Sequence, residues 1–140
     1  MRVLLDTNVV LDVLLNRQPW VTEASGIWQA NDAGELDGYI VATTLTNIFY
    51  VARRLTNLDR ARAAVRLCLD AFEICIVDRA ALEQAETLNG SDFEDNLQMA
   101  CAAQAGLDAI VTRDPAGFQS SAVLVLTPTE LLLRLKQTGP

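Results

Sequence analysis

The chain has 140 residues, of which 51% are hydrophobic, so it is long enough to bury one substantial core and short for two ordinary domains. It contains no histidine, which excludes Ser-His-Asp and Cys-His nucleophile arrangements and every His-ligated metal site. A net charge of −7 argues against general affinity for nucleic acid, so any such binding needs a local basic surface. We expect a single domain over residues 1–140, with any hydrolytic chemistry carried by carboxylates.

Short apolar and β-branched runs alternate along the chain with longer segments of helical period, which is typical of βαβ units and a parallel sheet. The predicted strands are residues 2–5, 38–41, 73–77, 108–112 and 122–126. The predicted helices are residues 9–15, 21–33, 44–55, 59–71, 79–88 and 91–105. Ser91 with Glu94, and Thr127 with Glu130, form capping boxes that predict helix starts, and Gly106 is expected to end the helix before it.

The apolar residues at the start of the chain do not have the pattern of a secretory signal, because Asp6 and Asp12 interrupt them and no small-residue cleavage site follows. No apolar stretch approaches the roughly 18 residues of a membrane span. Cys68, Cys75 and Cys101 fit neither a redox motif nor a zinc site, and we expect them to be buried free thiols. These features predict a cytoplasmic protein.

Four aspartates lie at the predicted ends of strands and helices. Asp6 ends the first strand, Asp114 lies two residues beyond the fourth, Asp95 starts the helix leading into the fourth, and Asp92 shares a helical face with Asp95. Ligands bind to open parallel sheets outside the carboxyl ends of the strands, where the strand order reverses. If the first and fourth strands are neighbours at that point, Asp6 and Asp114 face each other across one crevice.

Such a gathering of carboxylates is unfavourable alone, because each pair at about 4 Å repels by roughly 4 kcal/mol at an effective dielectric constant near 20. A divalent cation removes this penalty. Mg²⁺ or Mn²⁺ suits a site made only of oxygen ligands, and can activate water and neutralise the charge that develops on a phosphate. The acids therefore predict a metal-dependent hydrolytic site.

Each acid also has a purely structural interpretation. Asp92 lies in the first turn of a helix, where the helix dipole and capping favour acids. Asp114 precedes a proline and can open a turn, and Asp6 with Asn8 can cap a helix. Asp12 lies among apolar residues of the first helix, and we expect it to be solvated or at an edge rather than a ligand.

Three motifs taken in order resemble the PIN (PilT N-terminus) family, which includes the VapC-like toxins of bacterial toxin-antitoxin pairs. They are residues 6–8 (DTN), residues 92–98 (DFEDNLQ) and residues 111–114 (VTRD) followed by Phe118. The resemblance covers essentially the whole chain. It implies a three-layer α/β/α fold with a five-stranded parallel sheet in the order 3-2-1-4-5, and a Mg²⁺- or Mn²⁺-dependent endoribonuclease. It also implies an RNA substrate, an antitoxin partner and a homodimer.

By this resemblance Asp6, Asp95 and Asp114 match the acids of the family, Thr112 matches a hydroxyl that orients this corner, and Asn8 matches the polar residue beside the first acid. One position departs from the pattern. The family commonly has a glutamate on the helix after the second strand, where this chain has Asn47. Because an amide carries no charge, weaker metal binding follows unless Asp92 supplies the missing carboxylate.

Other α/β enzymes are a poorer match. A phosphoacceptor receiver domain needs an acid pair after the first strand and a lysine after the fifth, although Asp78 could be its phosphoacceptor. A haloacid-dehalogenase phosphatase needs an aspartate where Asn8 stands, and a dinucleotide-binding domain needs a Gly-rich turn. The main alternative is a catalytically weak or inactive PIN scaffold that binds RNA or protein, which Asn47 favours.

A basic stretch and an apolar stretch are the candidate contact surfaces. The basic stretch contains Arg53, Arg54, Arg60, Arg62 and Arg66. We expect RNA to reach the acids past Arg53 and Arg54; the alternative is that these arginines are solvated helix-surface charges paired with Asp59 and Asp70. The apolar residues 49–51 are compatible with a homodimer surface and equally with core burial.

Overall fold

The structure is a computed structural model that describes residues 1–138. Its strands are β1 (Arg2–Leu5), β2 (Asp37–Val41), β3 (Glu73–Cys75), β4 (Ala109–Val111) and β5 (Leu124–Leu126). Its helices are α1 (Thr7–Leu14), α2 (Val21–Asp32), α3 (Ala42–Leu55), α4 (Leu58–Ala71), α5 (Arg79–Thr87), α6 (Phe93–Gln104), α7 (Pro128–Thr138) and the short 3₁₀-helix η1 (Pro115–Phe118). Every predicted strand and helix overlaps one of these elements.

The strands form one parallel sheet in the order β3-β2-β1-β4-β5, as the resemblance implied. The order reverses between β1 and β4, because the chain runs from β1 outward to β3 and then returns to the other side of β1. Leu5 of β1 pairs with Val111 of β4, and the first amide after β1, that of Asp6, donates to the Val111 carbonyl at 3.0 Å. The ends of these two strands are therefore aligned.

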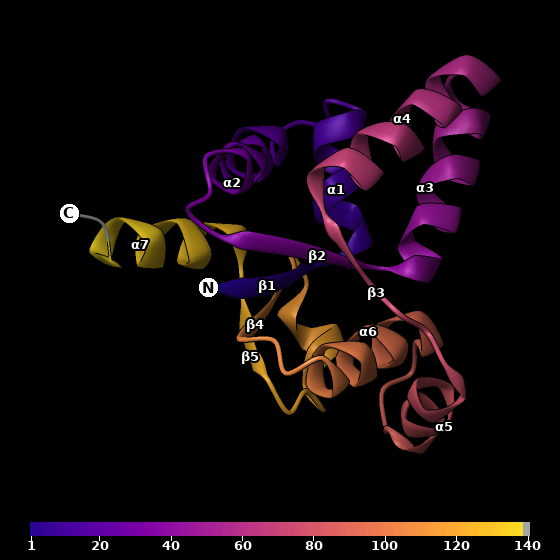
Figure 1. The fold of residues 1–140 in the computed structure, drawn as a ribbon, viewed down its shortest axis with the longest axis vertical. Helices are drawn as coiled ribbons and strands as arrows, with labels where there is room; N and C mark the ends of the chain where they lie inside the picture. Colours follow the sequence, from indigo (N-terminus) through magenta and orange to yellow (C-terminus); the bar gives the residue numbers. More distant parts are fainter. Residues whose placement is uncertain (139–140) are drawn as a thin grey trace.

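Helices cover both faces of the sheet (Figure 1). Side chains alternate along each strand, so Val3 and Leu5 pack among α1, α2, α3, α4 and α7, whereas Leu4 packs among α5 and α6. Ile110 follows Leu4 and lies on the α5–α6 side. This two-sided burial explains the nearly continuous apolar runs of the strands, and the architecture is the expected three-layer α/β/α arrangement.

Two of the three predicted helix-end signals are confirmed. The amide of Thr127 donates to Glu130 Oε1 at 3.0 Å and the amide of Glu130 donates to Thr127 Oγ1 at 3.2 Å, which completes a capping box. Gly106, at φ 65°, ends α6, where its amide and that of Leu107 donate to carbonyls in the last turn.

The predicted capping box of Ser91 and Glu94 is wrong. The helix α6 begins one residue later than that box requires, so Asp92 occupies the N-cap and accepts from the amide of Asp95 at 3.1 Å. Glu94 is then the second helical residue, from which a side chain does not reach back to the cap. Its carboxylate instead accepts from Thr7 on α1.

The cysteine prediction is confirmed. Cys68, Cys75 and Cys101 are buried and free, and burial raises the pKa of the Cys68 thiol to about 12 and that of Cys101 to about 11.

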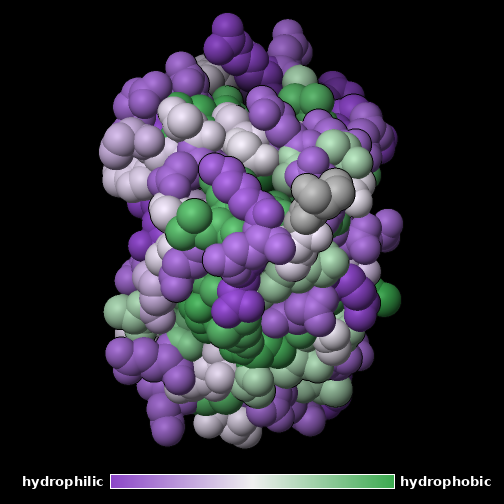
Figure 2. Space-filling model, turned by 90° about the vertical axis from the view of Figure 1, so that its left-hand side faces the viewer, coloured by the Kyte–Doolittle hydropathy of each residue, from purple (hydrophilic) through white to green (hydrophobic). Residues whose placement is uncertain are grey.

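Within residues 1–138, no helix has both the length and the apolar character that crossing a membrane demands. Figure 2 shows the side of the molecule that carries α7, where apolar surface is partly covered by polar side chains.

Candidate active site at the carboxyl end of the sheet

Asp6 is held from both sides at the point where the strand order reverses. Its Oδ2 accepts from Thr112 Oγ1 at 2.8 Å, and its Oδ1 accepts from Gln98 Nε2 at 3.0 Å. All three side chains are buried, with Asp6 only 7% exposed. Asp6 is the N-cap residue of α1, as the structural interpretation expected, but its side chain makes no capping hydrogen bond and is bound by Thr112 and Gln98 instead.

Asp95 and Asp114 both have a carboxylate oxygen close to Gly117 in η1. A Cβ atom built on Gly117 would lie 2.7 Å from Asp95 Oδ2 and 3.6 Å from Asp114 Oδ2. The amide of Asp114 also donates to Thr112 Oγ1 at 3.0 Å, which ties this acid to the residue that holds Asp6. The structure therefore brings the acids that follow β1 and β4, and the acid near the start of α6, to one end of the sheet.

The charges of these acids interact. Burial is the largest cause that raises the pKa of Asp95 from 3.8 to about 7, and repulsion from Asp92, Asp6, Glu94 and Asp114 raises it further. A carboxyl group with its pKa displaced this far is typical of functional sites. Repulsion among the acids therefore contributes to the raised pKa of Asp95, after burial.

Asp92 and Glu94 both lie in the first turn of α6 or just before it, beside Asp95. Asp92 is exposed and caps α6, so its carboxylate already has a structural partner. Glu94 Oε1 accepts from Thr7 Oγ1 at 3.0 Å, and the Thr7 hydroxyl lies 3.0 Å from Thr44 Oγ1 in the first turn of α3. Sequence reasoning gave Glu94 a capping role and missed its contact with Thr7 and its charge near Asp95. The sequence signal that could have found this is the position of Glu94 next to Asp95, which follows once Asp92 rather than Ser91 is assigned as the N-cap of α6.

The two asparagines lie at the edge of this arrangement. Asn8 is exposed, and its carbonyl and side-chain oxygens accept from Arg17 Nη2 at 3.5 and 3.2 Å. Asn47 is half-buried one helical turn beyond Thr44, and within residues 1–138 its side chain makes no hydrogen bond. The α3 residue that joins the network around Glu94 is thus Thr44 rather than Asn47.

The donor set fits a hard divalent cation that keeps part of its water shell. All candidate ligands are oxygens, and the fully buried Gln98 Oε1 has no hydrogen-bond partner in the described part of the chain. Gly117 leaves open the space between Asp95 and Asp114 that a Cβ would fill. Among residues 1–138, no three aspartates, glutamates or cysteines lie close enough together to hold a metal ion by themselves, so water would complete its ligands. Mg²⁺ characteristically binds through one or two carboxylates and several waters, and does not need a cage made only of protein ligands.

The expectation that Asp12 is solvated or at an edge is wrong. Asp12 is 1% exposed, and its two oxygens accept from Arg113 Nε at 2.7 Å and Arg113 Nη2 at 3.1 Å. Arg17 Nε lies 3.0 Å from Asp12 Oδ1. Two arginines from outside α1 make the burial of this charge possible, and helical periodicity alone does not reveal Arg113, which lies 101 residues away along the chain.

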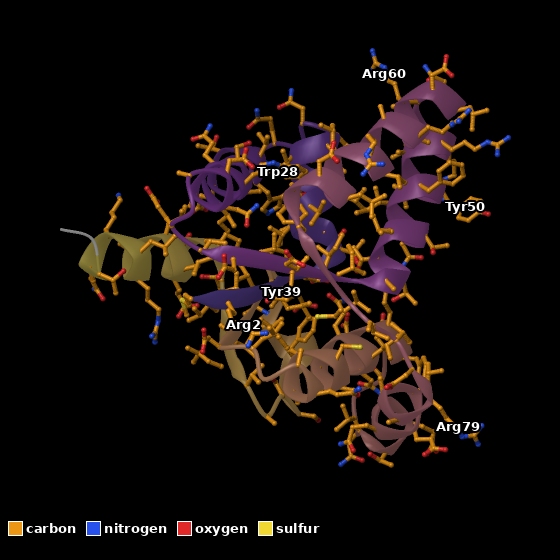
Figure 3. The ribbon with its side chains drawn as sticks, viewed as in Figure 1. Arg2, Trp28, Tyr39, Tyr50, Arg60 and Arg79 are labelled. Atoms are coloured by element: carbon orange, nitrogen blue, oxygen red, sulfur yellow. The ribbon has the colours of Figure 1, made fainter. Side chains whose placement is uncertain are left out.

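The basic stretch lies away from the acids. Thr44 in the first turn of α3 contacts the site, and Arg53 follows nine residues later, which is about 14 Å along a helix axis. In Figure 3, Arg60 lies at the outer end of α4 and Tyr50 points outward from α3. Arg66 pairs with Asp70 at 3.0 Å on the helix surface, as the alternative interpretation expected for that arginine.

Comparison with known proteins agrees with this arrangement. The family model described as "PIN domain" matches residues 2–116. Among curated proteins, none matches the chain significantly. A toxin-antitoxin complex from Klebsiella pneumoniae is 24% identical, with a TM-score of 0.67 over 90% of this chain and 97% of that one.

Two further solved structures share the fold. A DNA-bound VapBC complex from Salmonella typhimurium is 19% identical, with a TM-score of 0.69 over 91% of this chain and 98% of that one. VapC20 of Mycobacterium tuberculosis, described as a toxin that cleaves the sarcin-ricin loop, is 14% identical, with a TM-score of 0.64 over 77% and 86% of the two chains. Because the family model spans most of the sequence, the chain belongs to the PIN domain family.

Proposed function

We propose that this protein is a Mg²⁺- or Mn²⁺-dependent endoribonuclease that hydrolyses phosphodiester bonds of RNA. The observation that carries the proposal is the placement of Asp6, Asp95 and Asp114 at the reversal of strand order, with the pKa of Asp95 raised to about 7 by burial and by its acidic neighbours. An acidic site of this kind repels the phosphates of RNA, so catalysis there requires a cation between them.

Asp6, Asp95 and Asp114 would hold the metal ion. When bound, the ion would lower the pKa of a water molecule and neutralise the negative charge that develops on the phosphate. Thr112 and Gln98 hold both oxygens of Asp6 in place, so this carboxylate needs no reorientation when the ion binds. Glu94, fixed by Thr7, adds a negative charge at the α3 side of the site.

We further propose that the protein is the toxin of a toxin-antitoxin pair. The Klebsiella and Salmonella structures of similar fold are complexes of that type. An apolar hollow of about 410 Å³ between α1, α2 and α4, lined in part by Leu14, Trp28 and Leu67, offers a surface for the apolar side chains of an antitoxin. Tyr50, which is 61% exposed on α3, is the residue of the expected homodimer surface most available to a second copy.

A second candidate function is a catalytically weak PIN scaffold that binds RNA or protein. The neutral Asn47, where the family commonly has a glutamate, favours it. The two candidates differ in one measurable property, which is metal-dependent turnover.

The direct experiment incubates the purified protein with a structured RNA in Mn²⁺, and repeats the reaction with chelator and with Asp6→Asn. Cleavage that chelator and the substitution both abolish supports the nuclease. RNA binding without cleavage in any metal supports the scaffold instead. Inspection of the neighbouring reading frames for a small DNA-binding protein, followed by co-expression of the two proteins, tests the antitoxin partner.

A further inference from the structure

A buried charge cluster of Asp12, Arg17 and Arg113 lies outside the acids of the candidate site. Asp12, on α1, accepts two hydrogen bonds from Arg113 and forms an ion pair with Arg17. The Asp12 side chain is only 1% exposed. Asn16 has a left-handed backbone conformation, at φ 51°, which turns the chain after α1. The amide of Arg17 then donates a hydrogen bond to the Asp12 carbonyl at 3.0 Å. This turn is what brings the Arg17 side chain back beside Asp12.

Arg113 connects that cluster to the acids. It stands between Thr112, which donates to Asp6, and Asp114, and we name these three consecutive residues the 112–114 segment. The Arg113 guanidinium is held by Asp12 along one edge, and it stacks on Trp20 with 3.9 Å between Cζ and the ring centroid. The middle residue of the segment is therefore fixed by α1 and by the turn before α2.

Stability alone is a weak reason for such a cluster. Taking charges out of water costs several kcal/mol per ion, and well-packed apolar residues of similar volume often serve the fold equally well. The cluster does one thing that an apolar contact does not, which is to fix the direction of Arg113 through two parallel hydrogen bonds. Because the Arg113 side chain is fixed in direction, the backbone at its neighbours Thr112 and Asp114 is constrained as well.

We propose that Asp12 is a positioning residue of the metal site. It acts through Arg113. The pair of hydrogen bonds between Arg113 and Asp12 holds the 112–114 segment so that Thr112 donates to Asp6 and the Asp114 carboxylate lies near Gly117 and Asp95. The proposal rests on the proposed function and deepens it, because it adds a residue outside the acids to the machinery that binds the cation. Asp12 itself contacts neither the cation nor RNA.

The test compares two substitutions that each remove one guanidinium from Asp12 and keep the positive charge. Arg113→Lys cannot form the two-bond pair, because an ammonium is a single point donor. Arg17→Lys is the matched control, since Arg17 pairs with the same carboxylate but lies outside the 112–114 segment. The readouts are the Mn²⁺ dissociation constant, taken from the metal-dependent shift in melting temperature, and the turnover number and KM for RNA cleavage.

Arg113→Lys is expected to weaken Mn²⁺ binding by about 10- to 100-fold, the usual effect of losing a group that orients a metal ligand. Its turnover number should fall while KM changes little. Arg17→Lys should stay within about threefold of wild type in both readouts. Combining Asp12→Asn with Arg113→Lys should weaken Mn²⁺ binding no further than either substitution alone, because both break the same pair.

Equal Mn²⁺ affinities in the two lysine variants, measured where circular dichroism shows both to be folded, would overturn the proposal and leave the nuclease function standing. Additive effects of Asp12→Asn and Arg113→Lys would overturn it as well. A wild-type protein that neither gains stability from Mn²⁺ nor cleaves RNA would overturn the proposed function and this inference together.

Discussion

Thr112 donates its hydroxyl hydrogen to Oδ2 of Asp6 across 2.8 Å, and no part of the Thr112 side chain is exposed to solvent. The same hydroxyl oxygen accepts from the amide of Asp114 at 3.0 Å. One side chain therefore links the acid that follows β1 to the backbone of the acid that follows β4. In a buried setting this link is directional, since the hydroxyl has a single hydrogen and Asp6 takes it.

Replacing Thr112 with valine keeps the shape of the side chain and removes both contacts. Hydrogen bonds to charged groups contribute about 1.5–3 kcal/mol, so we expect Thr112→Val to lower the free energy of unfolding by that amount in chelator. Mn²⁺ binding should weaken by about 10-fold or more as Asp6 loses its orientation. Thr112→Ser, which keeps the hydroxyl, is the control. Urea denaturation with Mn²⁺ titration measures both quantities, and identical behaviour of the two variants would contradict the prediction.

The raised pKa of Asp95 predicts how stability depends on pH without metal. Because its pKa rises from 3.8 to about 7 on folding, the folded protein binds this proton more tightly than the unfolded chain does. The slope of the unfolding free energy against pH is therefore negative between those values. The contribution of Asp95 is most favourable below about pH 4, and it is lost as the pH rises to about 7.

Asp95→Asn removes this titration. In chelator at pH 8 the variant should melt roughly 2–4 °C above wild type, the shift that about 1 kcal/mol produces in a domain of this size once solvent screening of a partly exposed group is allowed for. The difference should vanish near pH 4. Mn²⁺ should stabilise wild type far more than the variant. Asp59→Asn, on the exposed surface of α4, is the control, and a lower melting temperature for Asp95→Asn at pH 8 would instead identify Asp95 as a structural residue.

Gly117 leaves open the space between two acids. Gly117→Ala places a Cβ 2.7 Å from Asp95 Oδ2, so the Asp95 carboxylate or the η1 backbone has to move. We expect the stabilisation by Mn²⁺ to drop by more than half, and cleavage to fall by at least 10-fold, about the scale of disturbing the surroundings of a metal ligand. Gly26→Ala in α2 is the matched control, because its Cβ meets only the flexible end of Leu132, at 3.5 Å. Equal Mn²⁺ responses of the two variants would show that this space is not used.

The exposed arginines at the end of α3 remain a prediction for RNA contact. If Arg53 and Arg54 each neutralise one phosphate, replacing both with alanine should reduce the slope of log binding constant against log salt concentration by about 1.4. The control double variant, Arg66→Ala with Arg79→Ala, removes the same charge from arginines that already pair with Asp70 and Glu83. Fluorescence anisotropy with a labelled RNA in chelator gives both slopes. A slope that matches wild type in the first variant would rule this route out.

The fold could be predicted from the sequence to a large extent, because its signals are local. Strands buried on both faces read as apolar runs, and the capping box at Thr127 and the glycine at Gly106 mark helix ends through contacts only a few residues apart. The start of α6 was misplaced by one residue, because Ser91 and Asp92 are both good caps and their order in sequence does not decide between them.

The site was predictable only in part. That Asp6 and Asp114 lie at one edge of the sheet could be predicted, because parallel strands bring their carboxyl ends to the same edge. The contacts of Glu94 and Asp12 could not, because their partners, Thr7 and Arg113, lie 87 and 101 residues away along the chain. Side-chain pairs at such separations leave no periodic trace in a single sequence.

Glu94 bears on whether the neutral Asn47 weakens the site. Glu94→Gln keeps the side-chain volume and an oxygen that Thr7 can still donate to, so it removes only the charge. If Glu94 supplies the negative charge that Asn47 lacks, Mn²⁺ binding should weaken by about 10-fold in this variant, the low end of the effect of a group next to a metal ligand. Glu86→Gln, on the exposed surface of α5, should bind Mn²⁺ like wild type.

A substitution at Asn47 tests the same compensation from the other residue. Asn47→Glu places a carboxylate where the family commonly has one, and it should restore most of the Mn²⁺ affinity lost in Glu94→Gln. In the wild-type background the same change adds a further negative charge on α3 to an already acidic site, so the melting temperature in chelator should fall while the stabilisation by Mn²⁺ rises. Melting curves of the four proteins, with and without Mn²⁺, measure both effects. If Glu94→Gln binds Mn²⁺ as wild type does and Asn47→Glu gains nothing, Glu94 is a structural partner of Thr7 alone.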